Sequence, residues 1–266
     1  MNCSFANFTN LTFLIVLCLS LNSCEQIIEV SLPQSSPEIV IEGYITNGAG
    51  PFLVKISQSQ SYFDQSNFKG INDADVEMDQ GQVKEKLTDR GGGVYSTSKI
   101  WGYPNKTYNL RVTVGENKYT ASVTLPPRVP IDTVYFQKGF LDKDSLNAFV
   151  QIPDPSASEN YYRIRVFRNG YFNSSDYNLV SDAHANGQTL LAPIYTNFTP
   201  GDTVVVELCN LDQSTWKYYK AVNDILQQGA GLQSPGNPAS NISGGALGYF
   251  GAMGRSFFKI IVPAAL

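Results

Sequence analysis

The chain has 266 residues and a formal net charge of −4, from 19 basic and 23 acidic residues. An acidic chain of this kind lacks the basic face that nucleic-acid binding requires, so we expect no nucleic-acid partner. His184 is its only histidine, and Cys209 is the only cysteine after Cys24. These residues argue against a histidine-based zinc site and against a framework of disulfides.

The N-terminal segment predicts an export signal followed by a lipid anchor. Leu11 to Leu21 is mostly apolar, and no charged residue precedes Glu25. The run is shorter than the roughly 20 apolar residues of a membrane-spanning helix, and it fits a signal-peptide core of roughly 7–15 residues. The stretch Leu21-Asn22-Ser23-Cys24 resembles a bacterial lipobox, which implies cleavage after residue 23 and acylation of Cys24. We therefore expect a signal peptide at 1–23 and a tether at 24–37; the alternative is an ordinary secretory signal that leaves Cys24 unmodified.

Residues 38–126 show the period-two alternation that is typical of β-strands. In "DADVEMD", Ala74, Val76 and Met78 take one side of the strand, and the acidic residues take the other. Breaks rich in Gly, Pro and Asn, such as 48–51 and 115–117, separate the runs, and no helical pattern lies between them. This spacing predicts a β-sandwich over residues 38–126.

The proline-rich segment 125–130 follows and predicts a joint to a second β-rich domain over residues 131–266. One helix is expected in this domain, near 213–228, capped by Asp212 or Ser214 and ending at Gly229. Its expected packing face carries Trp216, Tyr219 and Leu226. The fold class is therefore mainly β, with two β-sandwich modules of the Ig-like or transthyretin-like kind, the second of which contains one α-helix.

The most suggestive charged motif is the acidic alternation that contains Asp73 and Asp75. These two residues are candidates for a calcium site, because calcium prefers several oxygen ligands. Residues two apart on a strand lie about 6.6–7 Å apart, so one ion can bridge neighbours without collecting the row. The simpler interpretation is a solvent-exposed outer face, and we expect neither a metal nor another cofactor.

Nothing in the sequence marks a catalytic constellation. A Ser-His-Asp triad would have to use His184, and the chain lacks a Gly-x-Ser-x-Gly elbow. His184 lies in the polar stretch "SDAHANGQ", which is typical of a surface loop. We expect a protein without enzymatic activity; a hydrolase with carboxylates dispersed along the chain is the remaining alternative.

Aromatic clusters offer candidate residues for a ligand or partner surface. Recognition surfaces use exposed aromatic rings beside polar groups, and the candidates here are Tyr161, Tyr162, Trp216 and Tyr219. The alternative is that these rings fill sandwich cores. Tyr161 and Tyr162 face opposite sides of one strand, so we expect at most one of them in the core.

Several blocks together resemble a known family of bacterial lipoproteins. They are Cys24-Glu25, "IVIEGYITNGAGPFLVKISQSQSYF", "GGGVYST", "YTASVTLPPRVPID" and "GGALGYFGA". The chain is similar in these blocks to the Bacteroidetes outer-membrane lipoproteins called domain of unknown function 4249. The pattern "GVY…Y-x-L-x-V" from Gly93 to Val112 also resembles carboxypeptidase-regulatory-like or transthyretin-like sandwiches.

The resemblance implies an accessory, non-enzymatic outer-membrane lipoprotein that works with a TonB-dependent receptor in nutrient uptake, on a leaflet left undecided. The alternative is a structural or adhesion lipoprotein of the envelope. Three Asp-Ser/Thr-apolar triplets are similar to the Bacteroidetes O-glycosylation sequon. Their acceptors would be Thr133, Ser145 and Thr203.

Overall fold

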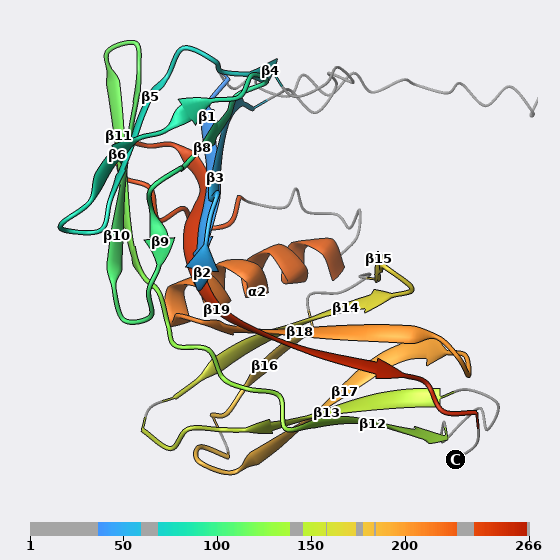
Figure 1. Ribbon diagram of the computed structural model, residues 1–266. Coiled ribbons are helices and arrows are strands. Elements are labelled where there is room, and N and C mark those ends of the chain that lie inside the picture. The colour runs from blue at the N-terminus through green and yellow to red at the C-terminus, as the bar shows by residue number, and fades with distance from the viewer. Residues whose placement is uncertain are drawn as a thin grey trace, which may run out of the picture. The chain divides into compact units, whose positions relative to one another are not determined.

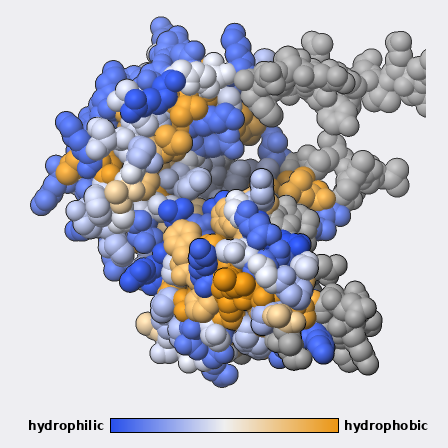
Figure 2. Space-filling view, turned by 45° about the vertical axis from the view of Figure 1, so that its right-hand side comes forward, coloured by the Kyte–Doolittle hydropathy of each residue, from blue (hydrophilic) through white to orange (hydrophobic). Residues whose placement is uncertain are grey.

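Most of the described chain is strand, and the strands form two sandwiches that share one long sheet (Figure 1). The computed structural model describes residues 37–59, 69–138, 146–157, 159–173, 178–183, 185–227 and 237–264. It therefore confirms the expected mainly β fold with a helix in the C-terminal half. Within these residues, no helix has both the length and the apolar character needed to span a membrane. Figure 2 shows one face of the molecule, on which hydrophilic residues surround hydrophobic patches that are larger in the lower half of the view.

The first sandwich packs part of a 10-stranded sheet against a 4-stranded sheet of order β11-β10-β5-β6. Its strands in the large sheet are β1 (Ile39–Thr46), β3 (Leu53–Gln58), β4 (Lys69–Gly70), β7 (Thr88–Asp89) and β8 (Val94–Ser96). The facing strands are β5 (Asp75–Asp79), β6 (Lys84–Lys86), β10 (Thr107–Val114) and β11 (Asn117–Thr124), and the short strands β2 (Gly48–Ala49) and β9 (Trp101–Gly102) pair with each other.

The second sandwich packs the remaining strands of the large sheet against a 3-stranded sheet of order β12-β13-β17. The small sheet consists of β12 (Thr133–Lys138), β13 (Leu146–Pro153) and β17 (Thr189–Phe198). The large sheet contributes β14 (Tyr161–Arg168), β15 (Tyr171–Asn173), β16 (Leu179–Ser181), β18 (Thr203–Leu211) and β19 (Leu247–Ile261).

Alternation along the strands builds the two cores, as the sequence predicts. Val76 and Met78 are buried in the first core, while Asp75 is exposed on the opposite face of β5. Val204 and Val206 are buried in the second core in the same way. Because side chains alternate between the faces of a strand, each apolar set reaches a single core.

Strand β19 belongs to both sandwiches. It runs parallel to β1 and antiparallel to β18, with Val40 opposite Leu247 in the first pairing. One face of β19 places Phe250 and Ala252 in the first core and Phe258 against the second. The predicted division at residue 131 differs from this arrangement, because the late segment that contains Phe250 completes the first sandwich.

The proline-rich joint crosses β19 at a glycine. A Cβ atom on Gly254 would lie 2.5 Å from the carbonyl oxygen of Pro127, which leaves no room for any side chain. That carbonyl also accepts a hydrogen bond from Asn210 Nδ2 at 2.9 Å. Close approach of two backbones is a usual reason for glycine within a strand.

Helix α2 (Gln213–Gln227) lies on the face of the large sheet that is opposite the cores. Asp212 caps it, since Asp212 Oδ1 accepts hydrogen bonds from the amides of Ser214 and Thr215, each at 2.9 Å. The predicted start of the helix and the Asp212 cap are confirmed; the predicted end, at 228 before Gly229, lies outside the described residues.

The expected packing role of Leu226 is wrong. Its side chain is 60% exposed, while Thr215 is buried and Trp216 and Tyr219 pack on the sheet. The helix contacts the sheet through its N-terminal half, so its last turn presents Leu226 to solvent.

Candidate functional site

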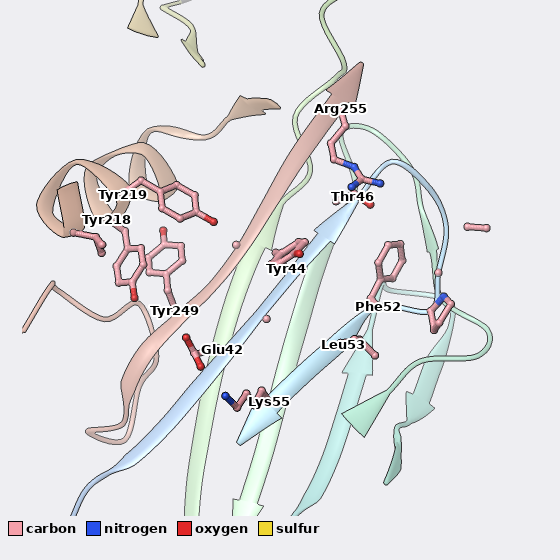
Figure 3. Close-up of a pocket in the computed structure, with 16 residues that line it drawn as sticks. Glu42, Tyr44, Thr46, Phe52, Leu53, Lys55, Tyr218, Tyr219, Tyr249 and Arg255 are labelled. Atoms are coloured by element: carbon pink, nitrogen blue, oxygen red, sulfur yellow. The ribbon is translucent and has the colours of Figure 1, made fainter. Parts of the chain in front are cut away.

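A groove of about 670 Å³ lies between helix α2 and strands β1, β3 and β19. We call it the tyrosine groove. Its lining residues are Glu42, Gly43, Tyr44, Thr46, Ala49, Gly50, Pro51, Phe52, Leu53, Lys55, Tyr218, Tyr219, Val222, Tyr249, Gly251 and Arg255. Figure 3 shows the side chains arriving from both sides of β19.

Strand register places the groove residues on the outer face of the large sheet. Tyr44 lies on β1 between Ile41 and Ile45 in sequence but on the opposite face from these core residues. Tyr44 pairs with Gly251 of β19, and Glu42 pairs with Lys55 of β3 and with Tyr249 of β19. Gly251 also lets helix α2 lie close to β19, because a Cβ atom there would lie 3.3 Å from Thr215 Oγ1.

Helix α2 supplies the opposite wall through a cluster of rings. Tyr218 stacks on Tyr249 with ring centroids 4.4 Å apart, and Tyr219 lies edge-on to Tyr218 at 5.9 Å. The guanidinium of Arg163 lies 4.6 Å from the centroid of the Tyr219 ring. These contacts fix the wall of the groove, because each ring is held by a neighbour.

Two apolar side chains in the groove remain open to solvent. Tyr44 is 49% exposed and Leu53 is 53% exposed. Both are drawn in Figure 3 on the strand side, across from the helix tyrosines. Adjacent exposed apolar groups in a concave site are what a ligand covers when it binds.

Arg255 lines one end of the groove and shares a buried carboxylate with Arg165. Glu207 is 1% exposed, and its carboxylate accepts hydrogen bonds from Arg165 Nη1 at 2.7 Å and from Arg255 Nη1 at 3.1 Å. Cys209 lies two residues further along β18, and burial, with a smaller contribution from the Glu207 carboxylate, raises the pKa of the Cys209 thiol to about 12. This thiol is therefore protonated at neutral pH.

The four aromatic residues that were predicted to form one surface lie in three different places in the structure. Tyr219 lines the groove. Tyr161 and Trp216 pack on each other beneath the helix, with ring centroids 5.0 Å apart. Tyr162 is fully buried in the second core, and its hydroxyl donates a hydrogen bond to Asp154 Oδ1 at 2.6 Å.

Two expectations about these tyrosines are therefore corrected. Tyr162 is not a surface residue, because its side of β14 faces the second core. Tyr161 is also buried, although it faces the other side, because helix α2 covers that face. The expectation that at most one of the two would be core is wrong for this reason.

The acidic alternation on β5 lies among basic residues of neighbouring strands. Asp75 forms an ion pair with Lys86 at 2.7 Å, and Asp79 forms one with Arg111 at 2.6 Å. Asp73 is exposed. No group of three or more His, Cys, Asp or Glu side chains that could hold a metal ion occurs in the described ranges.

The remaining predicted sites are only partly described. Thr133 and Thr203 are half-buried at the first positions of β12 and β18. Cys24, Ser145 and His184 lie outside the described residues.

Sequence reasoning missed Tyr44, Tyr249 and Arg255. A signal for Tyr44 is present in "IVIEGYIT", where an aromatic ring takes the same side of the strand as Glu42. No local signal places Tyr249 or Arg255 beside it, because β1 and β19 are far apart in the chain.

Comparison with known proteins identifies the family of this chain. No curated protein matches the chain. The sequence model of one protein family, described as Domain of unknown function (DUF4249), matches residues 25–256. That match covers almost all of the chain after Cys24 and includes every residue of the tyrosine groove. The chain belongs to the DUF4249 family.

Proposed function

We propose that this protein is a non-enzymatic binding protein of the bacterial outer membrane that uses the tyrosine groove to capture a small ligand for a TonB-dependent receptor. The groove is the observation that carries the proposal. Its volume of about 670 Å³ lies within the roughly 300–1,000 Å³ of small-molecule sites. The chain also belongs to DUF4249, the family whose resemblance implies the accessory outer-membrane role.

The lining of the groove suits binding. Aromatic rings supply large contact area with few rotatable bonds, so little conformational entropy is lost when a ligand covers them. The helix tyrosines are already held by stacking, and the strand side is set by the register of β1 against β19. A site built in this way is organised before the ligand arrives, which lowers the cost of binding.

The anchor is the second part of the proposal. Acylation of Cys24 would hold the mature chain at the membrane, and two or more acyl chains give stable attachment where a single chain gives marginal binding. Residues 24–37 would then serve as the tether between the lipid and the first strand. The resemblance of Leu21 to Cys24 to a lipobox supports this assignment.

The experiment compares the native chain with three variants in cells that make it. Cys24→Ser removes the proposed anchor and Tyr44→Ala removes an open groove ring. Tyr103→Ala is the matched control, since Tyr103 is 50% exposed, as Tyr44 is 49%, and lies outside the groove lining. Mass spectrometry then identifies acyl groups on Cys24, cross-linked receptors, and small molecules released on denaturation.

The proposal predicts an acylated Cys24, a cross-linked TonB-dependent receptor, and a released small molecule that is lost in Tyr44→Ala and kept in Tyr103→Ala. An unmodified Cys24 in a protein recovered from the soluble fraction would contradict the anchor. Equal small-molecule content in the two tyrosine variants would contradict the groove.

A further inference from the structure

Cations gather on the outer sheet face at one end of the tyrosine groove. Arg163, Cys209 and Arg255 are neighbours across strands β14, β18 and β19. Arg165 of β14 and Glu207 of β18 are neighbours in the adjacent row of residues on the same face of the sheet. The set holds three arginines and one carboxylate, although the chain as a whole has a net charge of −4.

The carboxylate of Glu207 is shared by two of these arginines. Glu207 is buried and receives both Arg165 and Arg255, so its one negative charge is divided between two guanidinium groups. The guanidinium of Arg163 lies over the ring of Tyr219, which lines the helix side of the groove. Two guanidinium groups therefore share one buried carboxylate beside the groove.

Arg255 brings one of these guanidinium groups into the groove. Its only side-chain hydrogen bond in the described part of the chain is the one from Nη1 to Glu207, and its Nε has no hydrogen-bond partner there. A guanidinium has five N–H donors, so Arg255 keeps donors that Glu207 does not use. Figure 3 shows Arg255 beside Thr46, at the opposite end of the groove from Glu42 and Lys55.

The other end of the groove is close to neutral. Glu42 and Lys55 are direct neighbours across β1 and β3, so their charges offset each other. Between the two ends lie Tyr44, Leu53 and the helix tyrosines. The groove is therefore polarised, with a cation at one end and an aromatic floor leading away from it.

We propose that the ligand of the tyrosine groove is an organic anion, with an aromatic or apolar body on the tyrosines and a carboxylate at Arg255. The inference rests on the proposed binding function and specifies its ligand class. Charge-assisted hydrogen bonds from a guanidinium to a carboxylate are among the strongest polar contacts available to a binding site. A cationic ligand would meet the arginine set, and an uncharged one would leave the donors of Arg255 unused.

Two probes of the same shape test the proposal on the full chain: 2-naphthoate, which carries a carboxylate, and 2-naphthamide, which is uncharged. Their affinities are measured by ligand-observed NMR titration. We expect 2-naphthoate to bind about tenfold more tightly than 2-naphthamide. Arg255→Gln should remove that preference without changing the affinity for 2-naphthamide.

Arg111→Gln is the matched control. It makes the same change of charge on β10, in the 4-stranded sheet, where Arg111 pairs with Asp79. The preference for 2-naphthoate should persist in this variant. Loss of the preference in both variants would show that net charge, and not Arg255, causes it, and would overturn the proposal.

Salt supplies a measurement that needs no variant, should Arg255→Gln fail to fold. Raising the ionic strength from about 0.01 M to about 1 M shortens the Debye length from about 30 Å to about 3 Å. The preference for 2-naphthoate should shrink over this range. A preference that is independent of salt contradicts the proposed contact with Arg255.

The results also separate this inference from the proposed function. Equal binding of both probes, reduced by Tyr44→Ala, overturns the anion while the groove remains a binding site. Tighter binding of 2-naphthylmethylamine than of 2-naphthoate overturns the anion in the same way. Absence of binding by every naphthyl probe overturns the groove as a ligand site, and the inference falls with it.

Discussion

Glu85 and Ser98 are joined twice: one carboxylate oxygen of Glu85 accepts hydrogen bonds from the amide and the hydroxyl of Ser98, each at 2.6 Å. The other oxygen accepts from the amides of Lys99 at 2.9 Å and Ile100 at 3.1 Å. Glu85 lies on β6 in the 4-stranded sheet, and the segment from Ser98 to Ile100 follows β8 in the large sheet. A single carboxylate thus ties the two layers of the first sandwich.

This contact makes the stability of the fold depend on acid pH. Burial raises the pKa of Glu85, but the hydrogen bonds from Ser98, Lys99 and Ile100 outweigh it and hold the pKa below its usual value of 4.5. A carboxyl with a depressed folded-state pKa stabilises the fold fully above the unfolded value. That stabilisation is lost as the pH falls through the folded value.

Glu85→Gln should therefore lower the free energy of unfolding at pH 7 by about 1–3 kcal/mol, because it removes the charged acceptor. Below about pH 4.5, the difference between the variant and the parent should narrow. Urea unfolding at several pH values measures both effects. Glu116→Gln, at an exposed turn between β10 and β11, should change neither; a constant difference across the pH range would refute the role of Glu85.

The buried hydroxyl of Tyr162 gives a second prediction. It donates to Asp154 at 2.6 Å, and burial together with the Asp154 carboxylate raises the pKa of Tyr162, so the phenol stays protonated. Tyr162→Phe should cost about 1.5–3 kcal/mol, the usual value for a hydrogen bond to a charged group. The melting temperature should fall by about 2–4 °C for each kcal/mol.

Tyr161→Phe is the natural comparison for that variant. The hydroxyl of Tyr161 accepts a hydrogen bond from the amide side chain of Gln213 at 2.9 Å. The same hydroxyl has a hydrogen bond with the side chain of Glu159, which is exposed, so water can replace that contact. We therefore expect a loss of about 0.5–1.5 kcal/mol, the smaller of the two. A larger effect at Tyr161 would show that the contact with Asp154 adds little to stability.

Substitution by aspartate should have a small effect on stability at one leucine of the helix region and a large effect at another. Leu226 is exposed on the last turn, so Leu226→Asp should change the free energy of unfolding by no more than about 0.5 kcal/mol. Leu211 is buried where the helix covers the sheet, so Leu211→Asp should cost more than about 3 kcal/mol. Denaturant midpoints compare the two; similar losses would mean that the last turn packs as tightly as the first.

The thiol of Cys209 should be protected from alkylation in the folded protein. Its pKa is raised to about 12 by burial and by Glu207, and only the thiolate form reacts readily. A chain that begins at Glu25 has Cys209 as its only cysteine, so labelling reports on it alone. At about pH 8, maleimide should label it only as fast as the protein unfolds. Labelling at the rate of a free thiol would contradict the buried position.

Sequence patterns predicted the parts of the fold that depend on near neighbours in the chain. Val76 and Met78 reach the core because alternation fixes the face of a strand, and Asp212 caps α2 because its acceptor reaches amides two and three residues on. Pairing between β1 and β19 depends on segments at opposite ends of the chain, and neither contains a signal for the other.

The candidate site was less predictable for the same reason. Tyr219 was named from an aromatic cluster on the helix, but the groove exists only where β1, β19 and α2 meet. Tyr162 was misplaced because alternation tells which residues share a face and not which element covers that face. Helix α2 covers the Tyr161 side and the second core covers the Tyr162 side, so both rings are buried.

The position of β19 also sets the order of events during biosynthesis. Val40 is synthesised long before its parallel neighbour Leu247. Nascent strand β1 therefore waits for β19 before the large sheet can close, which is the slow, long-range kind of contact. The first sandwich therefore stays incomplete until the strands of the second have been made, so the two sandwiches cannot fold one after the other.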